Sequence, residues 1–290
     1  MYQKIKVLIL GSTGQLGSAL NNLLKKDKKL KLIKLKKEID NLNIKNYLNK
    51  IQTKVDIIIN CIAYTDVEKS NTDKKKTLLL NKEFPNYLAK YCKINDTILI
   101  HFSTDFVFST KSKIKISENS KYSPINFYGY SKMMGEKCII RSNAKYLIFR
   151  TSWLYSRKRK NFLKTILTKI RERKKLHVIS DNYGIPTSTK FIVDFFKTNF
   201  KQFLNESNQK QIFHLVPNGY CSWYEFSLEI HKVFFPKRKN ETIYPISYKK
   251  YFSKIKRPVY SILSNKKIKY FFNCKVLSWK NYLKYYKKNI

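Results

Sequence analysis

Three regularly spaced glycines constrain the fold of this chain more than any other feature of its sequence. Gly11, Gly14 and Gly17 are three of only seven glycines in 290 residues, where about 20 are usual. The apolar run 4–10 precedes them and the amphipathic segment 18–26 follows, which predicts a buried strand, a tight turn and a helix. Such a turn lets the backbone and the free N–H groups of a helix N-terminus approach a pyrophosphate. The alternative is a tight turn that binds no ligand.

Strand and helix patterns alternate after this turn. A helix is predicted over 76–93, where Asn81 is a polar residue in an apolar stretch. Further strands are predicted in the apolar runs that begin at residues 30, 55, 97 and 146. This alternation is typical of a doubly wound parallel sheet, so we expect an α/β fold of the Rossmann type. We expect residues 1–155 to form an NADP-binding domain, with a return of the chain near 187–216, and residues 156–290 to form mainly a smaller C-terminal substrate-binding lobe.

The expected cofactor site extends to the ends of the next two strands. About 20 residues past such glycines, a basic side chain favours NADP and an acidic one favours NAD. Lys36 and Lys37 stand there and favour NADPH, although NADH stays open because lysine is abundant throughout, and Asp40 is expected on the adenine side. The expected cofactor-binding residues are Gly11, Thr13, Gly14, Gln15, Leu16, Gly17, Lys36, Asp40, Cys61, Ile62 and Ala63, together with Tyr128 and Lys132.

The stretch 97–137 contains the groups for chemistry. Its first part predicts a buried strand that ends in the hydroxyls of Ser103 and Thr104, and a helix from about Tyr128 follows. On a helix Tyr128 and Lys132 share a face, about 5–6 Å apart at Cβ, and an ammonium there favours the phenolate left after proton donation. We predict that Thr104, Tyr128 and Lys132 reduce a ketone with hydride from a nicotinamide. The alternative is a half-buried Tyr beside a solvated Lys, since roughly four such pairs are expected from composition alone.

The formal charge of +41 has two explanations. One is a nucleic-acid partner. The other is drift toward AT-rich codons, which is favoured because lysine is spread through nearly every polar segment while Gly, Ala and Pro are scarce. We therefore expect no nucleic-acid partner, and we interpret the basic run 157–160 (RKRK) as an exposed loop.

Apolar runs and cysteine use indicate the compartment. No run approaches the 18 or so apolar residues that span a membrane, and no signal-peptide pattern is visible at the start. Five cysteines without a C-x-x-C spacing fit reduced thiols in a cytoplasm, and four scattered histidines show no metal-ligand spacing. We expect a cytoplasmic protein with no membrane partner and no bound metal.

Eight motifs together resemble a known family. They are GSTGQLG (11–17), NCIAYTDVEKSNTD (60–73), FSTDFVF (102–108), SPINFYGYSKMMGE (123–136), FRTSWLYS (149–156), DNYGIPTST (181–189), FHLVPNG (213–219) and RPVYSIL (257–263). In this order the chain resembles the extended short-chain dehydrogenases/reductases, and within them the dTDP-4-dehydrorhamnose reductases. The resemblance spans nearly the whole chain, and Ser-Thr-Asp before Tyr-Gly-x-x-Lys is far more specific than the glycine turn alone.

The resemblance implies a reaction and residue roles. The reaction is the NADPH-dependent reduction of the C4 ketone of dTDP-4-dehydro-L-rhamnose to dTDP-L-rhamnose, the last step in making this nucleotide sugar for cell-surface polysaccharide. Tyr128 would protonate the C4 oxygen, Lys132 would lower the pKa of Tyr128 and hold the nicotinamide ribose, and Thr104 would bind the ketone. The implied substrate-binding residues are Thr65, Asp66, Thr104, Trp153 and Arg257.

The chain departs from the family pattern in places, and two alternatives stay open. Cys61 and Ile62 stand where the family often has alanines. Ala19 and Lys190 stand at an acidic, Mg²⁺-linked dimer surface of some members, so we favour a monomer. One alternative is another nucleotide-sugar epimerase, dehydratase or reductase of this fold, although Phe106 stands where dehydratases have a second acidic residue. The other is a non-catalytic regulatory relative, against which the retained reactive residues argue.

Overall fold

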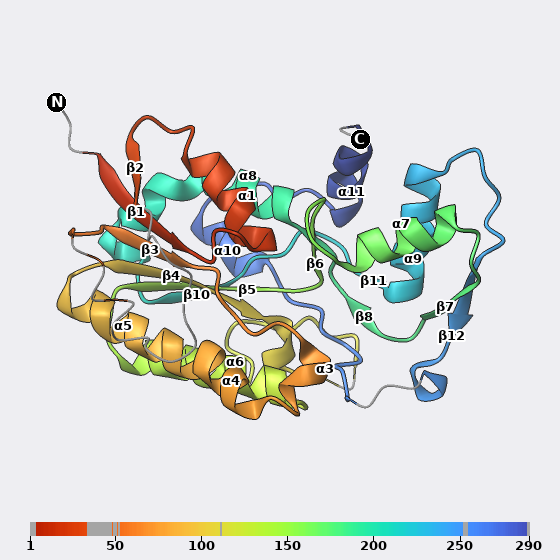
Figure 1. Ribbon diagram of the computed structural model, residues 1–290, viewed down its shortest axis with the longest axis horizontal. Coiled ribbons are helices and arrows are strands. Elements are labelled where there is room, and N and C mark those ends of the chain that lie inside the picture. The colour runs from red at the N-terminus through yellow and green to blue at the C-terminus, as the bar shows by residue number, and fades with distance from the viewer. Residues whose placement is uncertain are drawn as a thin grey trace.

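A six-stranded parallel sheet forms the centre of the computed structural model, which describes residues 4–33, 48, 51, 53–110, 112–251 and 255–288 (Figure 1). The strands lie in the order β10–β5–β4–β3–β1–β2. Their bounds are β1 Ile5–Leu10, β2 Leu30–Ile33, β3 Ile57–Asn60, β4 Ile98–Thr104, β5 Tyr146–Thr151 and β10 Gln211–His214. The predicted doubly wound parallel sheet of an α/β fold is confirmed.

The strand order reverses beside β1. The chain runs from β1 outward to β2 and then returns to β3 on the other side of β1. The register pairs Leu10 with Asn60 and Asn60 with His101, so the carboxyl ends of β1 and β3 lie level while β4 extends three residues further, to Thr104. In open sheets of this kind, ligands bind at the carboxyl ends of the strands where the order reverses.

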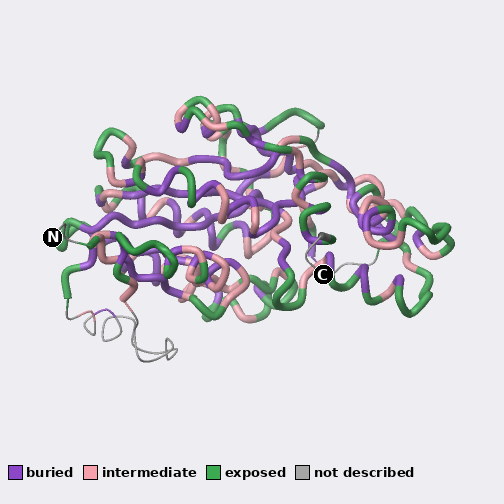
Figure 2. The backbone as a smooth tube through the Cα atoms, turned by 90° about the horizontal axis from the view of Figure 1, so that it is seen from above, coloured by how far each residue is buried: buried purple, intermediate pink, exposed green. Residues whose placement is uncertain are grey.

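Side chains of β1 alternate between two apolar layers. Val7 and Ile9 pack on one side of the sheet and Leu8 and Leu10 on the other, as the two-residue period of a strand requires. Figure 2 shows the strands as a buried layer with exposed residues at the periphery. One face is covered by α1 (Gln15–Leu24), α8 (Thr189–Asn199) and α10 (Lys266–Phe271), and the other by α4 (Lys74–Leu78), α5 (Phe84–Ile94) and α6 (Phe127–Arg141) (Figure 1).

The helix predicted over 76–93 is interrupted. A π-helical segment, Leu79–Glu83, separates α4 from α5 and contains the buried side chain of Asn81. A Cβ at Gly135 of α6 would lie 2.1 Å from the backbone oxygen of Asn81. The wider turn therefore packs directly against α6, at a contact that only glycine permits.

A second lobe packs around its own core at the right of Figure 1. Its centre joins apolar residues of α7, α9 and α11, among them Leu163, Phe226 and Leu283. Its elements are α7 (Phe162–Arg171), β7 (Leu176–Ile179), β8 (Tyr183–Gly184), β11 (Cys221–Ser222), α9 (Trp223–Phe234), β12 (Ile243–Ile246) and α11 (Trp279–Lys288). The remaining elements are α3 (Val67–Ser70), β6 (Leu154–Tyr155), β9 (Thr187–Ser188) and 3₁₀ turns at Asp105–Val107, Phe200–Leu204, Glu206–Asn208 and Tyr248–Lys250.

Helices α8, α10 and α11 were not indicated by the sequence patterns. Helix α8 begins where a turn-rich segment ends, because the Ser188 side chain accepts a hydrogen bond from the backbone N–H of Phe191 (3.0 Å) and so caps the helix. Helices α10 and α11 lie in the basic, aromatic-rich tail, where Ile268 and Phe272 pack into the same core as α1 and α8. Their helical periodicity is obscured by lysine and tyrosine.

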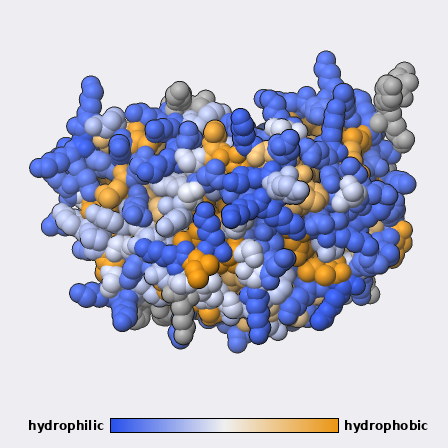
Figure 3. All heavy atoms as spheres, turned by 180° about the vertical axis from the view of Figure 1, so that it is seen from behind, coloured by the Kyte–Doolittle hydropathy of each residue, from blue (hydrophilic) through white to orange (hydrophobic). Residues whose placement is uncertain are grey.

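The face that Figure 3 shows is mainly hydrophilic, with apolar residues in small groups scattered over it. In the part of the chain that the structure describes, no helix combines the length and apolar character needed to cross a bilayer.

Gly135→Ala tests the contact between α6 and the π-helical segment. We expect the free energy of unfolding to fall by about 1–3 kcal/mol, since the added Cβ must displace packed backbone. Urea denaturation measures the change. Arg141→Ala, at the exposed end of the same helix, is the control and should stay within about 0.5 kcal/mol of wild type. Equal stability of the two variants would contradict this packing.

Candidate active site at the carboxyl end of the sheet

The glycine turn leaves the N-terminus of α1 open. Gly11 has a φ of +76°, and the N–H of Gly14 donates to its carbonyl oxygen (3.0 Å). A Cβ at Gly17 would lie 2.1 Å from that same oxygen, so α1 approaches the turn too closely for any side chain. No side chain caps α1. Its first N–H groups therefore remain available to an anion.

The turn meets the end of β3, where further cofactor contacts were predicted. A Cβ at Gly11 would lie 3.0 Å from the Ile62 side chain and 3.1 Å from the Cys61 backbone. Cys61, Ile62 and Ala63 are all half-buried. Burial raises the pKa of the Cys61 thiol to about 12, although Lys132 lowers it, so the thiol is protonated at neutral pH.

The other predicted cofactor residues differ from one another in their exposure and their contacts. Thr13 is exposed on the turn, while Leu16 is buried in the core above the sheet. The side chain of Gln15 donates from Nε2 to the carbonyl of Leu154 (3.2 Å). Lys36, Lys37 and Asp40 lie outside the described residues.

Tyr128 and Thr104 converge beyond the end of β4. Helix α6 begins at Asn126, whose side chain accepts a hydrogen bond from the Gly129 N–H (2.8 Å). A Cβ at Gly129 would lie 2.1 Å from the carbonyl oxygen of Phe106, so the helix starts directly against the turn that follows β4. This contact brings the phenol of Tyr128 close enough to Thr104 for the Thr104 hydroxyl to act on its pKa.

The proton of Tyr128 is firmly held. Burial raises the pKa of Tyr128 to about 12, and Asp105 adds to the rise while the hydrogen bond with Thr104 opposes it. The Thr104 hydroxyl donates to Oδ1 of Asp105 (3.1 Å) and accepts from the N–H of Phe106 (3.2 Å). The phenol therefore remains protonated across the neutral range.

Lys132 lies beside a buried histidine. Its Nζ donates to the carbonyl of Phe102 (2.8 Å) and lies 3.2 Å from Nε2 of His101. Nδ1 of His101 in turn contacts the amide of Asn60 (3.0 Å), and burial, followed by Lys132, holds the pKa of His101 well below its ordinary value. Burial also lowers the pKa of Lys132 to about 8. The predicted lowering of the pKa of Tyr128 by Lys132 is not seen in this arrangement.

A buried ion pair fastens α6 to the sheet. Nε of Arg150 on β5 lies 3.1 Å from both carboxylate oxygens of Glu136, and Nη2 lies 2.7 Å from Oε2, with both side chains almost fully buried. The Tyr122 hydroxyl donates to the same carboxylate (2.8 Å), as does the hydroxyl of Ser103. The hydroxyl of Ser103, at the end of the same strand as Thr104, is therefore bound to the ion pair.

Asn81 joins the loop after β3 to the reactive helix. Its Oδ1 accepts from the backbone N–H of Tyr64 (2.8 Å), and its Nδ2 donates to the carbonyl of Tyr64 (3.1 Å) and to the hydroxyl of Ser131 (2.9 Å). The sequence signal was a single polar residue in an apolar helix. Asn81 and the Glu136–Arg150 pair are supports of the site that sequence reasoning missed.

Trp153, predicted to bind substrate, lies in a ring stack. Its ring lies 3.5 Å from that of Trp223, with 9° between the planes, and its φ is +45°. A Cβ at Gly184 would lie 2.4 Å from the Trp153 ring, so glycine is required beneath it. The Trp153 ring is therefore fixed by this packing, two residues after the end of β5.

The other predicted substrate residues surround the start of α3. Thr65 and Asp66 are exposed, and the Asp66 side chain caps α3 by accepting from the N–H of Lys69 (3.0 Å). Nη2 of Arg257 lies 2.7 Å from a carboxylate oxygen of Glu68 on the same helix. The structure therefore brings Arg257 to this loop from a distant part of the sequence.

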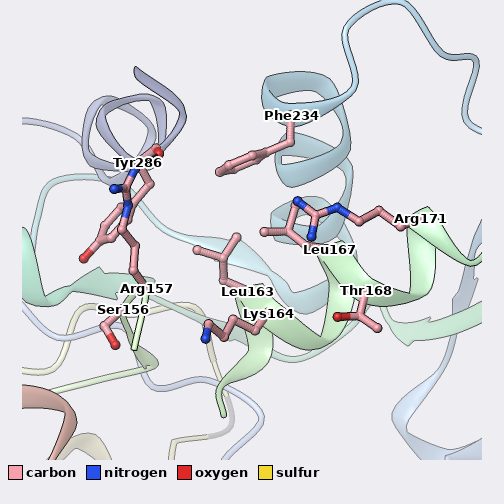
Figure 4. Close-up of a pocket in the computed structure, with 9 residues that line it drawn as sticks. All are labelled: Ser156, Arg157, Leu163, Lys164, Leu167, Thr168, Arg171, Phe234 and Tyr286. Carbon is pink, nitrogen blue, oxygen red and sulfur yellow. Dashed lines mark hydrogen bonds between the residues drawn. The ribbon is translucent and has the colours of Figure 1, made fainter. Parts of the chain in front are cut away.

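A separate pocket of about 360 Å³ lies in the second lobe (Figure 4). Its lining residues are Ser156, Arg157, Leu163, Lys164, Leu167, Thr168, Arg171, Phe234 and Tyr286. Leu163, Leu167 and Phe234 form an apolar floor between α7 and α9. None of the predicted site residues lines it, so it is not where the reactive groups meet.

A family model and two relatives show which known proteins this chain resembles. The family model for the RmlD substrate binding domain matches residues 5–290. The dTDP-4-dehydrorhamnose reductase of Salmonella typhimurium is 34% identical over 227 residues, which cover 77% of this chain and 76% of the relative. The spore coat polysaccharide biosynthesis protein SpsK of Bacillus subtilis is 32% identical over 267 residues, covering 91% and 90%.

Solved structures agree with this result. The crystal structure of dTDP-4-dehydrorhamnose reductase (rfbD) from Bacillus anthracis in complex with NADP has a TM-score of 0.90 and 28% sequence identity. The match covers 99% of this chain and 100% of that one.

Glu136→Gln tests the buried ion pair. It leaves the Arg150 guanidinium buried without its anion, so we expect the free energy of unfolding to fall by about 3–5 kcal/mol in urea denaturation. Glu172→Gln is the control, because Glu172 pairs with Lys174 at the surface, and it should change stability little. Similar small losses in both variants would show that the pair does not hold α6.

Proposed function

This chain belongs to the RmlD substrate binding domain family, and from that premise we propose that it uses NADPH to reduce the C4 ketone of dTDP-4-dehydro-L-rhamnose to dTDP-L-rhamnose. The supporting observation is the convergence of the Thr104 and Tyr128 hydroxyls beside the strand ends that meet the glycine turn. Phe106, where dehydratases have a second acidic residue, argues against the dehydratase alternative.

The residues of the glycine turn fit a dinucleotide pyrophosphate. The uncapped start of α1 offers N–H donors, and the missing side chains at Gly11 and Gly17 leave the backbone accessible. We assign Gly11 to Gly17 to the pyrophosphate and Cys61 to Ala63 to the nicotinamide side. Lys36 and Asp40 remain predictions for the adenosine side.

Tyr128, Thr104 and Lys132 have different roles in the proposed reaction. A bound nicotinamide supplies the hydride. Tyr128 donates its proton to the C4 oxygen, which is favourable despite its raised pKa because the alkoxide is far more basic than the phenolate. Thr104, which now donates to Asp105, turns its hydroxyl to the same oxygen. Lys132, held by Phe102, uses a remaining N–H for the nicotinamide ribose.

The residues that we assign to the substrate come from both parts of the chain. We assign Trp153 and Arg257 to substrate binding, with Thr65 and Asp66 beside Arg257. Residues 1–155, with the return near 187–216 that includes β10, serve as the cofactor domain. The larger part of 156–290 serves as the substrate lobe.

We further propose that the enzyme acts as a monomer in the cytoplasm. Ala19 carries no charge, and Lys190 forms an ion pair with Asp194 within α8. These positions therefore provide no acidic pair for a metal-linked dimer.

Tyr128→Phe tests the proton donor. We expect turnover to fall by a factor of about 10²–10⁴, the usual contribution of a general acid, while NADPH affinity stays nearly unchanged. NADPH oxidation with dTDP-4-dehydro-L-rhamnose measures turnover, and other keto sugars serve as comparison substrates. Tyr130→Phe, an exposed tyrosine on the same helix, is the control. Undiminished turnover in Tyr128→Phe would refute the assignment.

The lowered pKa of Lys132 predicts that the affinity for NADPH depends on pH. Because its pKa is lowered to about 8, the ammonium form prevails below pH 8 and the neutral amine prevails above it. We expect the Kd for NADPH to rise as the pH increases through about 8 and to lose this step in Lys132→Met. A step of the same size in the variant would assign the titration to another group.

A further inference from the structure

The basic loop 157–160 is attached to the glycine turn. Nε2 of Gln15, the first residue of α1, donates to the carbonyl of Leu154 (3.2 Å). Oε1 of Gln15 accepts from Nδ2 of Asn161 (3.0 Å), and Asn161 also caps α7 by accepting from the N–H of Lys164 (3.2 Å). Both ends of the loop are therefore held by one side chain of the cofactor-binding helix.

Arg159 reaches from this loop onto the turn itself. Its Nη2 donates to the carbonyl of Thr13 (2.8 Å), at the peptide bond that leads into Gly14 and the start of α1. Arg159 has a φ of +66°, in the left-handed region that non-glycine residues rarely occupy. A guanidinium has five N–H donors, and this contact uses one of them. Within the described part of the chain it is the hydrogen bond that the guanidinium makes, so the other donors can serve a ligand at the uncapped helix end.

Arg157, two residues earlier, points elsewhere. Its Nη2 donates to the carbonyl of Tyr286, and its guanidinium lies 5.7 Å from the centre of the Tyr286 ring. Figure 4 shows it beside Tyr286 at the edge of the pocket. The loop therefore directs one arginine to α11 and the other to the glycine turn.

We propose that Arg159 is a cofactor-binding residue whose guanidinium binds the pyrophosphate held at the N-terminus of α1. The inference rests on the proposed use of a dinucleotide cofactor. Guanidinium groups bind phosphate oxygens through paired, charge-assisted hydrogen bonds. Since Gln15 and Asn161 hold the loop in place beforehand, the contact requires little further ordering.

Arg159→Gln tests this role through NADPH binding, measured by fluorescence titration without substrate. We expect the Kd to rise about tenfold, equivalent to about 1.4 kcal/mol. The Kd for NADH should rise by the same factor, because both cofactors contain the pyrophosphate. High KCl should shrink the difference from wild type, as expected for a charge contact. Arg157→Gln removes the same charge from the same loop and should leave the Kd nearly unchanged.

Other outcomes would overturn the proposal. An unchanged Kd for NADPH would remove Arg159 from the site, and a loss confined to NADPH would assign it to the 2′-phosphate. Weakened dTDP binding with normal NADPH binding would assign it to the sugar nucleotide. Arg159→Lys, which keeps the charge, should bind NADPH between wild type and Arg159→Gln, and equal losses in both would indicate a structural role. A wild-type protein that binds no NADPH would reject the proposed function together with this inference.

Discussion

The buried pair of Glu136 and Arg150 is the interaction on which the site depends. It connects α6 to β5, and through the hydroxyl of Ser103 it also connects α6 to β4. Tyr128 and Lys132 lie on the same helix, so a shift of α6 would separate both from Thr104. A buried ion pair is costly to form, yet losing one partner is costlier still. Its directional hydrogen bonds fix the position of the helix more closely than apolar packing alone would.

Close backbone contacts provide the second constraint. Gly17, Gly129 and Gly135 each occupy a point where a Cβ would lie 2.1 Å from a backbone oxygen of another segment. Together they set α1 against the turn, the start of α6 against the end of β4, and the middle of α6 against the π-helical segment. This explains why so glycine-poor a chain retains glycine at these places, since no other residue allows such an approach.

Much of the fold and part of the site could be predicted from the sequence. The strand–turn–helix around Gly11 and the helix carrying Tyr128 follow from local periodicity and turn chemistry. The interruption at Asn81 could not be predicted, because a π-helical turn has the same local composition as the helix around it. The environment of Lys132 could not be predicted either, because His101 and Asn60 come from two different strands.

The sequence by itself determined the alternation of strands and helices up to the end of β5, the open glycine turn and the residue types available for reduction. These depend on interactions between residues close together in the chain. Only the tertiary structure decided which side chains face one another. Neighbouring residues of a strand point in opposite directions, so the hydroxyl of Ser103 donates to Glu136 while that of Thr104 donates to Asp105, on the side of Tyr128. In the same way Arg157 contacts α11 and Arg159 contacts the glycine turn, because their partners lie more than 100 residues away in the chain.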